Sequence, residues 1–198
     1  MQLGVPIAIQ DPLSTVAFLV VSAIVNNLGL IVSAAVGVAS KVFSLLLLVP
    51  SAFMQYMSAF VAQNMGDEKP ERVKKALWYG MATSLAAGLI IGYFAFFHCD
   101  LLSSSFAKEP DIITAAGQHL QVYAIDCVLA AFLFSFMGYF NGYGRTIFVM
   151  IQSISCALLI RLPVFLFKID LAILSATAVQ VVMCVVYFMM LNRKQMKA

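Results

Sequence analysis

The sequence predicts an all-α integral membrane protein, a bundle of six transmembrane helices. Of its 198 residues, 63% are hydrophobic and only 11% are charged. An ordinary soluble domain carries about 25% charged residues. A water-soluble fold of this length has too little interior to bury so much apolar surface, so lipid is the expected solvent for much of the chain. No segment alternates with the period of two that barrel strands show, which favours helices.

Apolar segments long enough to cross a bilayer recur along the whole chain. A hydrocarbon core of about 30 Å requires about 20 residues per helical span, and longer spans can tilt. We therefore predict that residues 1–198 form a single membrane lobe, with spans at about 5–27, 38–64, 77–98, 115–141, 146–167 and 171–191.

Basic residues between the spans are concentrated on one side. One set of gaps and the C-terminal tail hold eight of them: Lys69, Arg72, Lys74, Lys75, Arg145, Arg193, Lys194 and Lys197. The opposite gaps hold only Lys108 and Lys168. The positive-inside rule then predicts a multi-pass protein of the cell (inner or plasma) membrane with both termini in the cytoplasm. Gly66 is suited to end one helix there, and Pro70 to begin the next.

Polar residues within the spans fall on stripes at helical spacing. The stripe on the fourth span holds His119, Tyr123, Asp126, Ala130, Met137 and Asn141. The stripe on the second holds Lys41, Ser44, Leu48, Ser51, Gln55, Ser58 and Ala62, and the first span carries Ser14 and Asn26 among others. We expect these faces to turn toward one another or toward a shared aqueous cavity, lined by Lys41, Gln55, Asn26, Ser14, His119 and Asn141. Hydrogen bonding between helices is the alternative use of such stripes.

Asp126 lies deepest of the charged residues. It is 15 residues before Asn141, which is about 22 Å along a helix. A carboxylate at that depth must pair with a cation, bind an ion or take up a proton. Lys41 is a possible partner, so a static ion pair remains open. Asp11 and Arg161 also fall within predicted spans.

The remaining sequence patterns do not indicate a catalytic or metal-binding site. There is no catalytic triad order, phosphate-binding loop or HExxH helix, and Cys99, Cys127, Cys156 and Cys184 lack metal-ligand spacing. We expect neither an enzyme nor a nucleic-acid binder, and no cofactor or resident metal. A ridge of small residues at four-residue steps predicts close helix packing; its members are Gly80, Ser84, Gly88 and Gly92.

Four segments together resemble the multidrug and toxic compound extrusion (MATE) family. In chain order they are LGVPIAIQD (3–11), VPSAFMQYMSAFVAQNMGDEKPERVKKAL (49–77), YAIDCVLAAFLFSFMGYFNGYGRT (123–146), and the pair FVMIQ and RLPV. They are similar to that family's seventh, eighth, tenth and eleventh helices, with the turns that follow two of them. Their occurrence in the family's order makes the resemblance specific.

The resemblance implies one lobe, the second, of a twelve-helix transporter. Such transporters have two six-helix bundles around a central cavity and exchange a drug-like, often cationic, substrate for Na⁺ or H⁺. The family's tenth-helix carboxylate matches Asp126, with Tyr123 beside it, so transient Na⁺ binding there is implied. The sodium-coupled branch carries a glutamate on its seventh helix where this chain has Ser14, which leaves the coupling ion open.

Function follows from the resemblance as an expectation: the C-terminal lobe of a multidrug efflux antiporter. Alternating access needs two moving halves, so we expect a missing N-terminal lobe, whether the chain is a fragment, pairs with a separate chain or self-associates. Two alternatives remain. A flippase-like half for lipid-linked substrates would need a cationic cavity, for which only Lys41 and Arg161 are available, and an orphan lobe could insert without transporting.

Overall fold

The computed structural model describes residues 16, 19–20, 22–27, 29–67, 70–161 and 169–195, and the regular structure in these ranges is helical. The elements, in order, are α2 (Leu30–Leu46), α3 (Leu48–Gly66), α4 (Pro70–Phe97), α5 (Cys99–Ser104), α6 (Pro110–Gly142), α7 (Thr146–Cys156), the π-helical turn η1 (Ala157–Arg161) and α9 (Ile169–Gln195). Most of the predicted first span, with Asp11 and Ser14, lies outside the described residues, as do the Arg161 side chain and Pro163.

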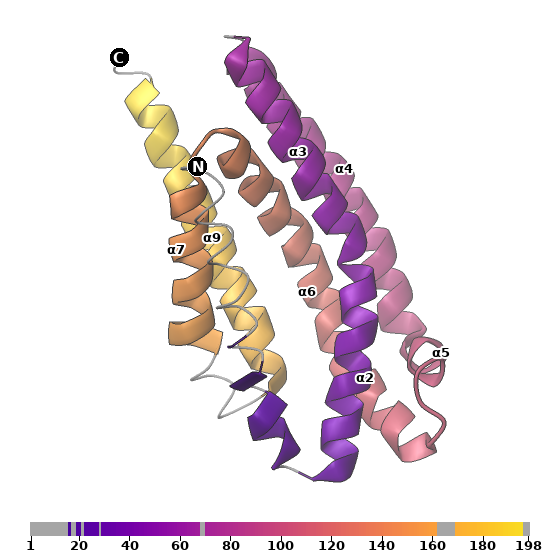
Figure 1. The fold of residues 1–198 in the computed structure, drawn as a ribbon. Coiled ribbons are helices and arrows are strands. Elements are labelled where there is room, and N and C mark those ends of the chain that lie inside the picture. Colours follow the sequence, from indigo (N-terminus) through magenta and orange to yellow (C-terminus); the bar gives the residue numbers. More distant parts are fainter. Residues whose placement is uncertain are drawn as a thin grey trace.

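Helix α6 is the centre of the bundle. It has 33 residues, about 50 Å of helix, and it packs against α2, α3, α4, α5, α7 and α9. Figure 1 shows it between the α3–α4 pair on one side and the α7–α9 pair on the other. In its most apolar stretch 56% of the residues are buried, against 28% in α4 and 17% in α9. Side chains on α6 are therefore the ones held by protein on most sides.

The predicted ridge of small residues on α4 packs as expected. A methyl group added at Gly92 would lie 2.9 Å from the carbonyl oxygen of Ala124, and one added at Gly88 would lie 2.9 Å from the Ala131 side chain. The Ser84 hydroxyl donates to the Ala131 carbonyl at 3.2 Å. The prediction of close helix packing is confirmed: Ser84, Gly88 and Gly92 pack on α6, whereas Gly80 faces Met57 of α3.

Proline and glycine residues explain where several helices begin, end or are interrupted. Helix α3 ends at Gly66 and α4 begins at Pro70. Pro50 has no N–H to offer the Leu46 carbonyl, and the long apolar helix from Leu30 to Gly66 is interrupted at Leu47. Gly144, with a φ of 77°, occupies the left-handed region in the turn between α6 and α7.

Helix α2 begins at Leu30, whereas the sequence predicted a span beginning near residue 38. Gly37 lies within the helix, facing open space. Its intrinsic cost of about 1 kcal/mol is offset because α2 buries Ala35, Val36, Val38 and Ala39.

Four helices of the described part are long and apolar enough to cross a membrane: Leu30–Gly66, Glu71–Phe97, Pro110–Gly142 and Ala172–Leu191. A shorter apolar helix covers Thr146–Ile160. Large apolar side chains on α4 are exposed, among them Trp78, Tyr79, Ile90 and Tyr93. This outward apolar surface is what a lipid-facing helix presents.

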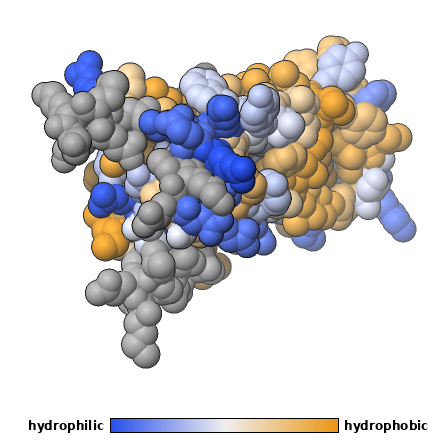
Figure 2. Space-filling view, turned by 90° about the horizontal axis from the view of Figure 1, so that it is seen from above, coloured by the Kyte–Doolittle hydropathy of each residue, from blue (hydrophilic) through white to orange (hydrophobic). Residues whose placement is uncertain are grey.

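A large part of the apolar core lies at the end of the bundle that carries the 66–70 and 142–145 connections. An apolar cluster there joins α3, α4, α6, α7 and α9, and includes Val61, Leu77, Phe140, Val149 and Cys184. Figure 2 looks onto this end, where hydrophilic side chains gather near the middle and apolar side chains cover the α3–α4 side.

Candidate functional site

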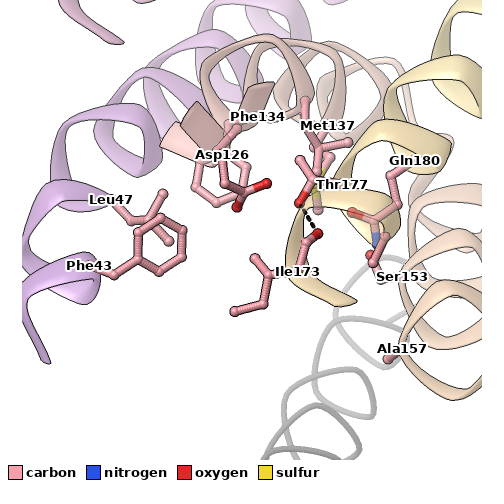
Figure 3. Close-up of a pocket in the computed structure, with 13 residues that line it drawn as sticks. Phe43, Leu47, Asp126, Phe134, Met137, Ser153, Ala157, Ile173, Thr177 and Gln180 are labelled. Carbon is pink, nitrogen blue, oxygen red and sulfur yellow. Dashed lines mark hydrogen bonds between the residues drawn. The ribbon is translucent and has the colours of Figure 1, made fainter. Parts of the chain in front are cut away.

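A cavity of about 340 Å³ opens between α2, α6, α7 and α9. We call it the Asp126 cavity. Its lining residues are Phe43, Leu47, Asp126, Ala130, Leu133, Phe134, Met137, Ser153, Ala157, Ile173, Ala176, Thr177 and Gln180. Figure 3 shows Phe43 and Leu47 on one side of Asp126, and Ser153, Thr177 and Gln180 on the other.

Among the described lining residues Asp126 is the charged one, and it is 2% exposed. The residues that follow it at steps of three and four, Ala130, Leu133, Phe134 and Met137, line the same cavity. The stripe predicted on the fourth span therefore faces a real cavity from Asp126 to Met137. A carboxyl group buried this deeply is stable when it is protonated, or when it is ionised with a cation or hydrogen-bond donors close by.

The opposite wall supplies neutral oxygen atoms from α7 and α9. The Thr177 hydroxyl donates to the Ile173 carbonyl at 3.1 Å, which leaves its oxygen able to accept or coordinate. Ser153 and Gln180 add a hydroxyl and an amide. The described residues hold no group of three or more acidic, histidine or cysteine side chains that could bind a metal. One carboxylate with neutral oxygens suits a proton or a monovalent cation.

Sequence reasoning missed this opposite wall, because it considered only the stripes on the first, second and fourth spans. A signal was present: Thr177 and Gln180 lie three residues apart in a largely apolar span, so they share a helix face. Gln152 was also missed. It is 2% exposed, and its amide donates to the Gln180 carbonyl at 2.9 Å and approaches the Cys184 sulfur at 3.2 Å. This pair of contacts fixes α7 against α9 beside the cavity.

The backbone at the cavity is irregular. Helix α7 passes into the π-helical turn η1 at Ala157, and Ala157 lines the cavity. Single π turns in α-helices are frequent at functional sites, because they break the regular ladder of hydrogen bonds. The wall of the cavity thus includes a point where α7 departs from α-helical geometry.

Tyr123 does not line the cavity. Its side chain is 2% exposed and packs with Ala39, Val42 and Leu120. Its ring lies 5.0 Å from the ring of Phe43, centroid to centroid. Since Phe43 does line the cavity, Tyr123 supports the wall from behind.

Lys41 and Gln55 lie away from the Asp126 cavity. Both side chains are exposed, and α2 buries the other face, with Ala35, Ala39 and Val42. The static ion pair between Lys41 and Asp126, which the sequence left open as an alternative, does not fit this arrangement, because the Lys41 side chain is exposed and the Asp126 side chain is inside the bundle. We call the exposed or half-buried stripe to which Lys41 belongs the outer stripe, which comprises Lys41, Ser44, Leu48, Ser51, Gln55, Ser58 and Ala62. A role for the outer stripe in a cavity shared with a second lobe remains a prediction.

The remaining candidates also lie away from this cavity. Asn26 is exposed before α2, where its amide oxygen accepts a hydrogen bond from the Ser33 hydroxyl. His119 and Asn141 are half-buried toward opposite ends of α6, and neither contributes to the lining. Ser14 falls outside the described residues.

Comparison with known proteins gives three matches. A family model described as MatE matches residues 6–167. A FAD transporter from Shewanella oneidensis is 23% identical over 158 residues, which are 80% of this chain and 35% of that protein. A solved MOP superfamily transporter from Pyrococcus furiosus, reported to have a binding pocket of reversed polarity, superposes with a TM-score of 0.82 at 19% identity.

That structural match covers 94% of this chain and 42% of the archaeal transporter. The likeness confirms the predicted all-helical membrane fold. The chain spans less than half the length of both relatives, as one lobe of a two-lobe protein would.

Proposed function

Since the chain belongs to the MatE family, we propose that it is the C-terminal lobe of a multidrug efflux antiporter, which exports drug-like or organic cationic compounds in exchange for Na⁺ or H⁺. A chain of this family with helices this apolar is a multi-pass membrane protein. Cytoplasmic termini, expected from the distribution of basic residues, belong to the proposal. So does a second lobe, because one bundle cannot open alternately to two sides.

The observation that carries this proposal is the buried carboxylate of Asp126, in a cavity whose other described lining residues are uncharged. A negative charge in a low-dielectric site attracts a cation or a proton strongly. Binding there changes the charge of the cavity, and so changes the relative free energies of two packings of α6 against α7 and α9. The irregular turn at Ala157 lies where such a change would act.

Na⁺ and H⁺ both fit the oxygen atoms available. A proton needs only the carboxylate, whereas Na⁺ would also use neutral oxygens such as those of Thr177, Ser153 and Gln180. Among the described lining residues Asp126 is the one carboxylate, which disfavours a divalent ion, because hard divalent ions are usually held by several carboxylates.

The relative named as a FAD transporter supports a second candidate substrate, a flavin dinucleotide. A dinucleotide carries negative charge at its phosphates, which the Asp126 carboxylate would repel. A negatively charged cavity therefore favours the organic cation. Export of FAD and of a fluorescent organic cation can be measured in the same cells, and the ratio of the two rates separates the candidates.

The decisive experiment replaces Asp126 with Asn, which keeps the size and removes the charge. In bacterial cells lacking their own efflux pumps, Asp126→Asn should abolish cation-dependent efflux of ethidium at an unchanged amount of folded protein in the membrane. Asp111→Asn is the matched control, because Asp111 is exposed in the first turn of the same helix. Full efflux by the Asp126 variant would rule out the coupling role.

A second measurement does not require the other lobe. Ligands that bind only the folded state raise its stability, so Na⁺, relative to choline, should raise the Tm of the purified chain, and Asp126→Asn should remove that increase. A chain that exports nothing, and gains no stability from Na⁺ or from added protons, would instead be an inert lobe.

A further inference from the structure

A second cavity of about 340 Å³ lies away from the Asp126 cavity, against α9 and the turn that precedes α7. Its lining residues are Arg145, Tyr187, Met190, Leu191 and Arg193. None of them lines the Asp126 cavity. We call this feature the arginine groove.

The groove lies where two apolar helices reach the edge of a bilayer. The apolar part of α9 ends at Leu191, two residues before Arg193. Arg145 directly precedes the apolar helix that begins at Thr146. In Figure 1 the start of α7 and the C-terminal part of α9 lie toward the same end of the bundle. The two arginines thus stand at the level of lipid headgroups, with apolar side chains on the hydrocarbon side.

The charges at the groove are of one sign. Arg145 and Arg193 are both exposed, and the described lining residues include no carboxylate. Within the part of the chain that the structure describes, neither guanidinium forms an ion pair. Two arginines at one mouth repel each other unless an anion lies between them, and a guanidinium is well shaped to hold a phosphate through paired hydrogen bonds.

The floor of the groove is apolar and well supported. The Tyr187 ring stacks on the Phe148 ring at 3.8 Å between centroids, with 8° between the planes, and lies 5.2 Å from the Phe140 ring. Met190 on the next turn is 57% exposed. A rigid aromatic floor beside a flexible, exposed methionine suits an extended hydrocarbon chain.

We propose that the arginine groove binds an anionic phospholipid of the phosphatidylglycerol type. The phosphate lies between Arg145 and Arg193, and one acyl chain runs along Met190 and Leu191. Basic residues at the ends of membrane helices attract anionic lipids with about 1 kcal/mol each. A soluble anion would gain nothing from the apolar floor, which is why a lipid is the expected occupant.

A contrasting groove supports the role of charge. A cavity of about 260 Å³ between α3 and α4 is lined by Phe53, Tyr56, Met57, Phe60, Ala76, Tyr79, Gly80 and Thr83, with no charged side chain. Both grooves can hold an acyl chain, but only the arginine groove can distinguish lipids by headgroup charge. The purified chain should therefore bind phosphatidylcholine and phosphatidylglycerol with different numbers of strong sites.

The test is native mass spectrometry of the full purified chain, titrated with phosphatidylglycerol and, separately, with phosphatidylcholine. At about 1 kcal/mol per arginine, Arg145→Ala and Arg193→Ala should each weaken phosphatidylglycerol binding about fivefold, and the double variant about thirtyfold. Phosphatidylcholine binding should stay unchanged. Arg72→Ala is the matched control, since Arg72 is an exposed arginine of α4 that lines neither groove.

Three results would overturn the proposal: an equal loss in Arg72→Ala, equal affinity of the unmodified chain for the two lipids, or competition by inorganic phosphate at lipid-like concentrations. Arg145→Lys preserves the charge, so it should keep its unfolding temperature and most of the preference for phosphatidylglycerol over phosphatidylcholine. This variant distinguishes a loss of charge from a loss of folding. Asp126→Asn should bind phosphatidylglycerol normally, which keeps this result separate from the outcome for transport.

Discussion

The Asp126 cavity and the outer stripe contain similar residues in opposite surroundings. Both combine a charged side chain with hydroxyls and an amide, which come from three helices in the cavity and follow helical spacing in the outer stripe. Asp126 is 2% exposed and faces Ser153, Thr177 and Gln180 inside the bundle. Helices α2 and α3 pack on the bundle with one face, and Lys41 and Gln55 are exposed on the opposite face.

The difference shows what a polar stripe on a membrane helix can mean. In a lobe that meets only lipid, an exposed lysine and glutamine would be costly. The outer stripe is therefore best explained as a surface that a second lobe covers or that borders water between lobes. In our proposal, the Asp126 cavity is formed by residues of this chain, whereas a second lobe would cover the outer stripe. The variants below test that division, from the largest expected effect to the smallest.

Asp126→Lys should have the largest effect. It reverses the charge of a buried group and leaves an uncompensated cation in the bundle, so the free energy of unfolding should fall by about 3–5 kcal/mol. Lys41→Glu also reverses a charge, but at an exposed position, and should change stability by no more than about 0.5 kcal/mol. Denaturation of the purified chain in detergent measures both. Similar losses in the two variants would show that Lys41 is buried by something within this chain.

Gln152→Leu comes next. The substitution removes the hydrogen bond from the buried Gln152 amide to the half-buried Gln180 carbonyl, at a cost of about 1–3 kcal/mol. Gln55→Leu is the matched exterior variant, and it should leave the isolated chain unchanged or slightly more stable, because Gln55 is exposed. The same denaturation experiment applies. A larger loss for Gln55→Leu than for Gln152→Leu would reverse the assignment of interior and exterior.

The sequence could predict which residues are polar and how deep they lie, but not which way each helix is turned. The depth of Asp126 follows from counting residues, and the class of fold follows from composition. Orientation depends on which face of α2 buries more surface, and Ala35, Ala39 and Val42 decide this against the face that carries Lys41. Small residues gave no hydropathy signal strong enough to show it.

The helix ends show the same limit. Pro70 and Gly66 act through local backbone chemistry, so the turn between α3 and α4 was predictable. The start of α2 depends instead on packing against α6 around Gly37, which no local pattern reveals. The Ser153 and Thr177 wall was missed for a related reason: its members come from two helices, and only the fold brings them together.

Thr177→Val should act on ion binding more than on stability. It keeps the volume of the side chain and removes one neutral oxygen from the cavity, so the affinity for Na⁺ should fall about fivefold if that oxygen contributes about 1 kcal/mol. Ser44→Ala, on the outer stripe, also removes a hydroxyl that bonds its own helix, at 2.8 Å to the Ser40 carbonyl, and should leave the affinity unchanged. The Na⁺-dependent rise in Tm provides the readout. Equal losses of affinity in the two variants would show that Na⁺ does not bind in the Asp126 cavity. No loss in either variant would favour H⁺ as the coupling ion.

The smallest change in stability is expected for cysteine variants used in a labelling experiment, which tests whether a second lobe covers the outer stripe. The four native cysteines are buried, so they should react slowly with a maleimide in the folded protein. Lys41→Cys and Gln55→Cys should react quickly in the isolated lobe, with little change in stability, because both positions are exposed. Leu159→Cys is the control, since Leu159 is 74% exposed on a different helix. When the lobe is reconstituted with a first-half chain of the family, labelling should slow at Lys41→Cys and Gln55→Cys and persist at Leu159→Cys. Unchanged labelling at all three positions would mean that the outer stripe faces lipid, and that its polar residues need an explanation other than a second lobe.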